Sequence, residues 1–165
     1  MTRSLSVVGE PTEISSGVRQ PETIASALAD VLADTYMLTY KTHAYHWNVE
    51  GPLFYSIHNL TESQYEDMFA AADELAERMR SLGQMAPMTM TEISKRSVID
   101  DSKEKPTAGE MCEALAADHE RIAHRLHALI EIAGAKNDPV TEDLATERSA
   151  FHEQAAWMLK ALIAK

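Results

Sequence analysis

Residues 57–77 read IHNLTESQYEDMFAAADELAE, and their polar side chains gather on one side of the helix that this stretch predicts. Each residue of an α-helix turns by about 100°, so Glu62, Asp73 and Glu77 lie at about 40°, 60° and 100° from His58. One imidazole and three carboxylates therefore share less than a third of a turn. They form two i, i+4 pairs, His58 with Glu62 and Asp73 with Glu77.

This arc has two interpretations. On an acidic chain, a row of carboxylates is often only a solvated helix face. Phe69 and Ala76 lie on the same arc, however, which favours an interface. His58 and Glu77 are also symmetric about the same midpoint as Glu62 and Asp73, between residues 67 and 68, while His58 and Glu77 are roughly 28 Å apart along the axis. A second copy of this helix, antiparallel across a two-fold axis, would bring the two ends together twice.

The rest of the chain also predicts helices. Stripes of apolar or small residues at helical spacing indicate four long helices, at about residues 21–50, 54–82, 107–134 and 138–162. The connection between the second and third contains one short helix, at about residues 89–98. This is an all-α four-helix bundle with a short helix in its crossover connection. Residues 1–20 lack periodicity and predict a flexible tail, so the bundle domain spans residues 21–165.

Composition narrows the classes of function. The chain has 165 residues, one cysteine and a formal charge of −11 at pH 7. A single cysteine excludes an internal disulfide, and neither an export signal nor a membrane span is evident, so we expect a cytoplasmic protein. Association with the nucleoid stays open. So acidic a surface repels nucleic acid phosphates and anionic membranes, and it attracts cations.

The candidate ligands are nitrogen and oxygen donors without thiolate, a set that suits Fe(II), Mn(II) or Zn(II). Di-iron bundles usually bind their metals through Glu-x-x-His motifs, and this motif is absent at every histidine of the chain. A metal site must therefore lie elsewhere, and the predicted interface is the available place. His46, at the edge of the first helix's apolar stripe, is a candidate second imidazole or an ordinary core residue.

Residues 41–83, KTHAYHWNVEGPLFYSIHNLTESQYEDMFAAADELAERMRSLG, resemble the signature of the Dps proteins (DNA-binding proteins from starved cells, or miniferritins). The resemblance extends over residues 22–165 and implies a ferritin-like bundle in a hollow homododecamer. It also implies oxidation of Fe(II) to Fe(III), preferentially by hydrogen peroxide, with ferric mineral stored inside and DNA protected from oxidative damage. Iron would be the only cofactor, and no organic cofactor is expected.

The resemblance also implies roles for individual residues. The ferroxidase site at a two-fold interface would take ligands from two subunits: His46, His58 and Glu62 from one, and Asp73 and Glu77 from its neighbour. Trp47 would lie beside the site as a redox neighbour, although a buried core tryptophan is an equally good interpretation.

Acidic residues crowd the start of the fourth predicted helix: Asp138, Glu142, Asp143 and Glu147. In the family this region lines a three-fold pore through which iron passes, and Asp143 is the first candidate. The helix dipole alone also favours carboxylates at this position.

The sequence departs from the family in its tail. Members that bind DNA generally use Lys- and Arg-rich tails, whereas residues 1–20 have two arginines against two glutamates. We therefore expect weak or absent DNA binding and assign no DNA-binding residue. The alternative functions are a nucleoid-compacting DNA-binding protein with iron secondary, and an inert interaction bundle. The remaining histidines are expected at the surface or hydrogen-bonded, and Cys112 as a small packing residue.

Overall fold

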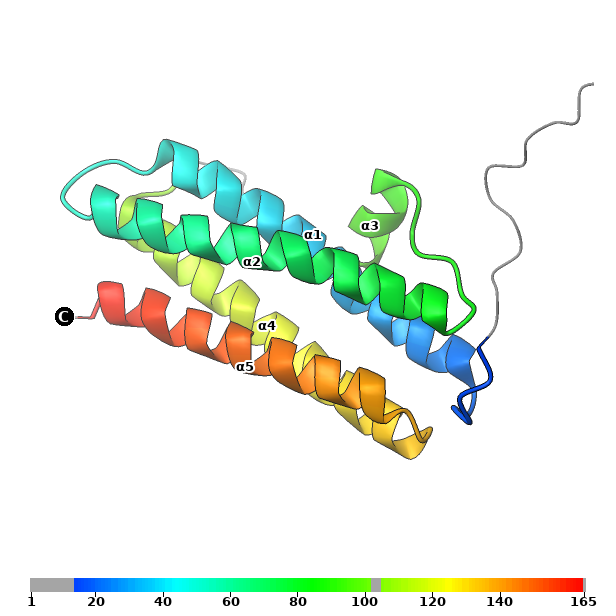
Figure 1. Cartoon of the computed structure of the whole chain (residues 1–165). Helices are drawn as coiled ribbons and strands as arrows, with labels where there is room; N and C mark the ends of the chain where they lie inside the picture. Colours follow the sequence, from blue (N-terminus) through cyan, green and yellow to red (C-terminus); the bar gives the residue numbers. More distant parts are fainter. Residues whose placement is uncertain (1–13, 102–104, 165) are drawn as a thin grey trace, which may run out of the picture.

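The computed structural model describes residues 14–101 and 105–164, and all regular structure in these ranges is helical. Four long helices form the bundle: α1 Pro21–Asn48, α2 Phe54–Ser81, α4 Ala108–Ala135 and α5 Pro139–Leu162 (Figure 1). The short helix α3, Met90–Arg96, lies in the connection between α2 and α4. The predicted all-α four-helix bundle with a short helix in its crossover is thus confirmed.

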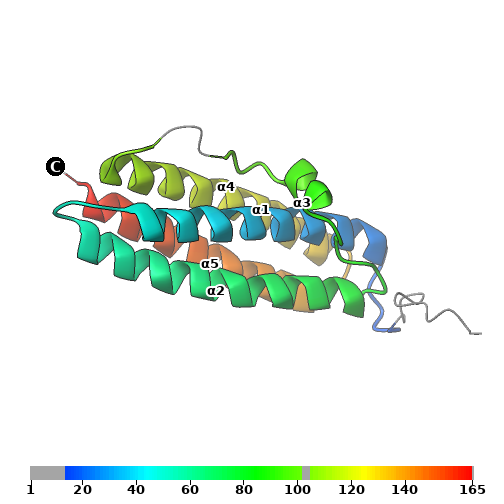
Figure 2. The same cartoon turned by 90° about the horizontal axis from the view of Figure 1, so that it is seen from above.

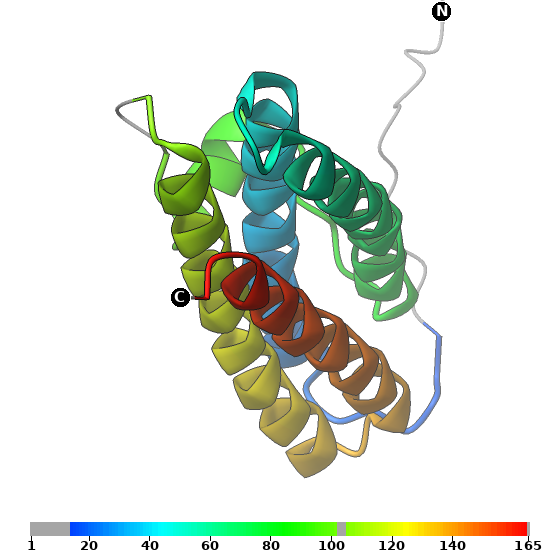
Figure 3. The ribbon, with the colours of Figure 1, turned by 90° about the vertical axis from the view of Figure 1, so that its left-hand side faces the viewer.

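The bundle consists of two antiparallel hairpins. α1 pairs with α2, and α4 pairs with α5, each pair through a short turn (Figure 2). The long crossover runs from the end of α2 back along the bundle to the start of α4, and it carries α3 against α1. Viewed from the end, the four long helices surround one common core (Figure 3).

Side chains at helical a and d spacing fill this core. On α1 the buried stripe includes Ile24, Leu28, Leu38 and Tyr45, all at most 6% exposed. The other long helices contribute equivalent stripes of Leu, Ile, Met and Ala side chains. A strict stripe of this kind is typical of antiparallel bundles packed at shallow crossing angles.

The sequence signals at helix ends act largely as predicted. Thr107 and Glu110 form a reciprocal capping box at the start of α4. Thr89 caps α3 by accepting a hydrogen bond from the Glu92 backbone N–H, but the Glu92 carboxylate accepts from Met88 instead of closing a second capping box. α3 also ends earlier than expected, at Arg96.

A buried carboxylate anchors the crossover to the bundle. Asp34, on α1, accepts hydrogen bonds from the Ser97 hydroxyl, the Val98 backbone N–H and the Arg125 guanidinium of α4, at 2.7–2.9 Å. Burial nevertheless outweighs these bonds and raises the pKa of Asp34. This network joins three elements far apart in the sequence.

Residues 1–13 of the predicted tail lie outside the described residues. The residues just before α1 contact the turn between α4 and α5. The Arg19 backbone N–H donates to the Lys136 carbonyl at 2.8 Å, and its guanidinium donates to the Ala135 carbonyl at 2.9 Å. The predicted boundary at residue 20 stays a prediction.

Candidate metal centre

His46 of α1 and His58 of α2 form the centre of the candidate site. Their rings stack with centroids 3.7 Å apart and planes 17° apart. His46 Nδ1 lies 2.8 Å from the His58 carbonyl oxygen, and His58 Nδ1 lies 3.0 Å from the His46 carbonyl oxygen. This reciprocal pair fixes both rings relative to the α1–α2 hairpin.

The hydrogen bonds also determine the tautomer. A carbonyl oxygen only accepts, so each Nδ1 must carry the proton and donate. In the neutral rings, Nε2 then holds the lone pair that a metal ion requires. Metal-ligating histidines commonly donate their other ring N–H to a backbone carbonyl in this way, which orients the ring and raises its basicity.

Aromatic side chains surround the pair. Phe54 stacks on His58 with centroids 4.9 Å apart, and Tyr65 meets His46 edge-on at 5.3 Å. Burial, together with the Glu62 and Glu66 carboxylates, raises the pKa of Tyr65. His43 completes the group by stacking on Tyr65 at 4.1 Å.

Trp47 is 57% exposed, so it is not a core residue. Its ring centroid lies 4.1 Å from that of His43, one turn before it on α1. The alternative of a buried core tryptophan is therefore wrong for the single chain. The redox role of Trp47 stays a prediction.

The predicted carboxylates lie along α2. Glu62 is half-buried next to the histidines, whereas Asp73 and Glu77 are exposed toward the other end of the helix. Asp73 is fifteen residues from His58, roughly 22 Å along the helix axis. Within one chain, no three His, Cys, Asp or Glu side chains of the described residues converge on a possible metal position.

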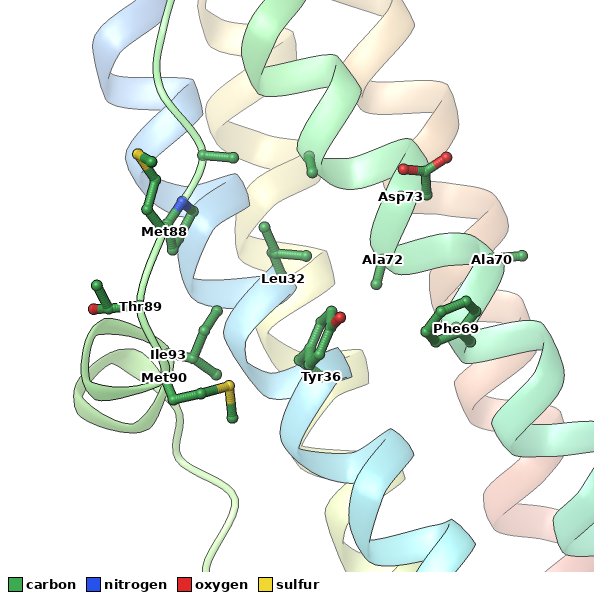
Figure 4. Close-up of a pocket in the computed structure, with 13 residues that line it drawn as sticks. Leu32, Tyr36, Phe69, Ala70, Ala72, Asp73, Met88, Thr89, Met90 and Ile93 are labelled. Atoms are coloured by element: carbon green, nitrogen blue, oxygen red, sulfur yellow. The ribbon is translucent and has the colours of Figure 1, made fainter. Parts of the chain in front are cut away.

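An apolar groove of about 780 Å³ lies beside Asp73. Figure 4 shows it between α1, α2 and the crossover, with Tyr36 of α1 between Phe69 of α2 and Met90 of the crossover. Phe69 and Met90 are 64% and 65% exposed. The predicted helix arc thus does carry exposed apolar surface together with its carboxylates, which a purely solvated face would not explain.

The acidic residues at the start of α5 differ in environment. Asp138 is fully buried, caps α5 by accepting from the Thr141 backbone N–H at 3.0 Å, and pairs with Arg78 of α2 at 2.7 Å. These contacts hold the Asp138 carboxylate in the interior of the bundle, so it is not available to line a pore. Glu142 is half-buried against Gly134, while Asp143 and Glu147 are exposed.

The remaining histidines fall into two groups. His124 and His127 are exposed, as expected, and His127 pairs with Glu153 at 3.0 Å. His119 and His152 are buried in the core and hydrogen-bonded to each other, with their Nδ1 atoms 2.8 Å apart, so the hydrogen-bonded alternative applies to them. Sequence reasoning missed this pair, although both residues occupy core-facing positions of their helical stripes. Cys112 is buried and free, as expected.

Comparisons with known proteins agree with this architecture. The family model described as "Ferritin-like domain" matches residues 25–165. The DNA protection during starvation protein 2 of Bacillus anthracis is 34% identical over 140 residues, covering 85% of this chain and 96% of that protein. The chain belongs to the Dps family of ferritin-like proteins.

Solved Dps structures have the same fold. Dps from Staphylococcus aureus superimposes with a TM-score of 0.86 at 30% identity, covering 90% of this chain and 99% of that one. Dps from Vibrio cholerae, described as a member of a broad superfamily of ferritin-like diiron-carboxylate proteins, gives 0.83 at 27% identity, covering 88% and 91%. Membership of the Dps family indicates iron storage and DNA protection as the general function.

Among the described residues, no helix is both long and apolar enough to span a bilayer.

Proposed function

We propose that this Dps chain is a ferroxidase that oxidises Fe(II) to Fe(III), preferentially with hydrogen peroxide, and stores the ferric product inside a hollow homododecamer in the cytoplasm. Removing iron and peroxide together would protect DNA from oxidative damage. The proposal depends most on one observation, the reciprocal His46–His58 pair, whose hydrogen bonds leave Nε2 of each ring available to a metal ion.

A second subunit would complete the ligand set. His46, His58 and Glu62 come from one chain, and Asp73 and Glu77 come from its two-fold partner. The described part of one chain lacks a three-ligand cluster, which supports a shared site. The exposed apolar groove beside Asp73 supports it too, because a second copy of α2 lying there would bury Phe69.

The ligand chemistry accounts for oxidation. Carboxylates prefer the harder Fe(III) product, so they lower the reduction potential of bound iron and favour electron loss. Two Fe(II) ions supply two electrons to one hydrogen peroxide, whose O–O bond breaks, and two protons complete two water molecules. Because peroxide is reduced by two electrons at once, no hydroxyl radical is released.

Trp47 is the proposed redox neighbour. Its exposed indole lies against the His43 ring, with centroids 4.1 Å apart and planes tilted by 42°, and Trp47 directly follows His46 in the sequence. If a one-electron oxidant forms at the site, the indole can donate the missing electron. The oxidising equivalent would then stay on the protein.

Iron would reach the interior along the acidic start of α5. Asp143 and Glu147 are exposed and one helical turn apart, so copies around a three-fold axis would form a ring of negative charge. Glu142 is a weaker candidate because it packs on Gly134. We leave Asp138 out of this route because it is buried in its ion pair with Arg78.

We propose protection of DNA through chemistry and not through a stable DNA complex. The formal charge of −11 opposes binding to phosphates. A nucleoid-compacting protein with secondary iron chemistry is the alternative, and retardation of plasmid DNA in a gel would favour it.

Iron titration of the assembled protein tests the ferroxidase. Fe(II) is added without oxygen, then hydrogen peroxide, and Fe(III) formation is followed by ultraviolet absorbance. We expect rapid oxidation in the unmodified protein and at least a tenfold slower rate in Asp73→Ala. Glu74→Ala is the matched control, since Glu74 is an exposed carboxylate next in sequence but about 100° away around the helix. Equal rates in the two variants would contradict the proposal.

A further inference from the structure

The core of the bundle contains one polar layer, to which each long helix contributes one side chain. The four are Thr42 of α1, Gln64 of α2, His119 of α4 and His152 of α5, all at most 3% exposed. Each occupies a core-facing position between apolar neighbours, such as Leu38 and Tyr45 around Thr42. Bundle proteins build internal sites from facing side chains of this kind.

Two ion pairs between helices, together with the His119–His152 hydrogen bond, indicate that the four residues lie at a similar height in the bundle. Lys41 pairs with Asp118 at 2.7 Å. Thr42 and His119, the next residues on antiparallel helices, are therefore about 3 Å apart along the axis. Arg148 pairs with Asp67 at 2.5 Å. By the same reasoning, this second pair puts Gln64 and His152 within about one residue of each other.

His119 and His152 close one side of the layer through their hydrogen bond. Four buried atoms have no hydrogen-bond partner within the described ranges: Thr42 Oγ1, Gln64 Nε2, Gln64 Oε1 and His119 Nε2. Thr35, on the same stripe of α1, differs, because its hydroxyl donates to the Val31 carbonyl at 2.9 Å. Leaving four such atoms unpaired would cost a large part of the stability of a domain, so a partner must fill the layer.

The charge of the surroundings decides what kind of partner fits. The layer contains an amide, a hydroxyl and two imidazoles but no carboxylate, so nothing in it would neutralise a buried cation. Arg148 lies beside the layer, because its guanidinium carbon is 4.5 Å from the centre of the Phe151 ring. The Phe151 ring in turn meets the His119 ring edge-on. Burial and the nearby Arg148 also lower the pKa of His119, which agrees with an environment that disfavours positive charge. The partner must be small, neutral, and able both to donate and to accept.

We propose that Thr42, Gln64, His119 and His152 form an internal hydration site that holds water at the centre of the bundle. Buried water makes about three hydrogen bonds per molecule, so about one or two molecules satisfy the four atoms. Gln64 contributes a donor and an acceptor, and Thr42 can contribute either. The site is distinct from the candidate metal centre and does not depend on the proposed function.

A crystal structure of the assembled protein tests the site directly. We expect water density within about 2.7–3.2 Å of Thr42 Oγ1, the Gln64 amide and His119 Nε2. A Gln64 amide bonded directly to His119 or Thr42, with no density between them, would overturn the proposal. An anomalous scattering peak in the layer would overturn it as well, since it would identify a metal ion.

Thermal unfolding of variants gives a second test. Thr42→Val and Gln64→Leu should each lower Tm by several degrees, because each removes one partner of a shared water and leaves the other stranded. The double variant should lose clearly less than the sum of the two shifts.

Thr35→Val is the matched control, since its hydroxyl has a backbone partner. Its effect should add to that of Gln64→Leu. Additive shifts for Thr42→Val and Gln64→Leu would show that no shared molecule links them and would contradict the hydration site.

Discussion

His119 and His152 show how burial changes the chemistry of a side chain. Burial, and secondarily Arg148, lowers the pKa of His119 to about 3, and burial also lowers the pKa of His152. Below pH 6.5 the unfolded chain therefore takes up protons that the folded chain excludes. Stability should fall as the pH falls from 6.5 toward 3, by about 1.4 kcal/mol per pH unit for His119 alone.

Denaturant unfolding at fixed protein concentration, between pH 7 and pH 5, measures this loss. The window avoids most carboxylates, which titrate at lower pH. His124→Gln, which changes an exposed histidine on the same helix as His119, is the comparison variant. A stability that does not change across this range would contradict the buried neutral pair.

Asp138 is expected to act on stability and not on iron uptake. Its fully buried carboxylate is held by Arg78 and Thr141, and although burial opposes ionisation, these hydrogen bonds lower its pKa. Asp138→Ala should lower the free energy of unfolding by about 3 kcal/mol, since it removes a helix cap and strands a guanidinium. Unfolding of Asp143→Asn provides the comparison and should be unchanged. Equal stability of both variants would show that the ion pair contributes nothing.

The role of Asp138 marks a limit of sequence reasoning at the residue scale. The sequence identifies Asp138 as the N-cap of a helix because Pro139 follows it. It does not identify Arg78, which is 60 residues away and reaches Asp138 only after α2 packs near α5. The same limit applies to His46 and His58, whose reciprocal hydrogen bonds require the α1–α2 hairpin.

At the scale of elements, the sequence predicts most of the fold. Stripes at helical spacing locate the four long helices, and local caps such as Thr107 with Glu110 locate their starts, because both depend on neighbouring residues. Helix α3 is predicted less well. Its end at Arg96 coincides with long-range contacts, since the next residues donate to Asp34 on α1.

The N-terminal part of α5 is the element expected to control iron uptake. Asp143 is exposed there, so Asp143→Asn would remove negative charge from the proposed pore without disturbing the cap. We expect uptake at low ionic strength to slow several-fold, while Fe(II) affinity at the ferroxidase site stays the same. The difference should shrink as salt is added, because screening weakens attraction. Unchanged uptake at low ionic strength would remove Asp143 from the pore.

At the scale of the whole molecule, the charge of −11 governs interaction with DNA. We expect no retardation of plasmid DNA in a gel near physiological salt and neutral pH, without added divalent metal. Repulsion from phosphates is the reason, and it strengthens as salt is lowered. A retarded complex under these conditions would favour the nucleoid-compacting alternative.

The candidate site is only half predictable from one chain. The spacing of His58, Glu62, Asp73 and Glu77 is symmetric about one midpoint, which permits a two-fold site. Symmetric spacing can also arise by chance, and a single chain cannot contain the second half of a shared site. A test of the arrangement must therefore mix chains.

Complementation between two inactive variants tests the shared site. If each site takes His58 from one subunit and Asp73 from its neighbour, His58→Ala and Asp73→Ala homo-oligomers should both lose rapid ferroxidation. After the two are unfolded together and reassembled at equal ratio, a mixed two-fold pair has one site with both lesions and one site with neither. Random mixing makes half of the pairs mixed, so about a quarter of all sites should be intact.

A site built within one chain would recover nothing, because every chain carries a lesion. Activity near a quarter of the unmodified level, with mixed assembly confirmed by mass spectrometry, supports the shared site, and activity no higher than that of the separate variants contradicts it.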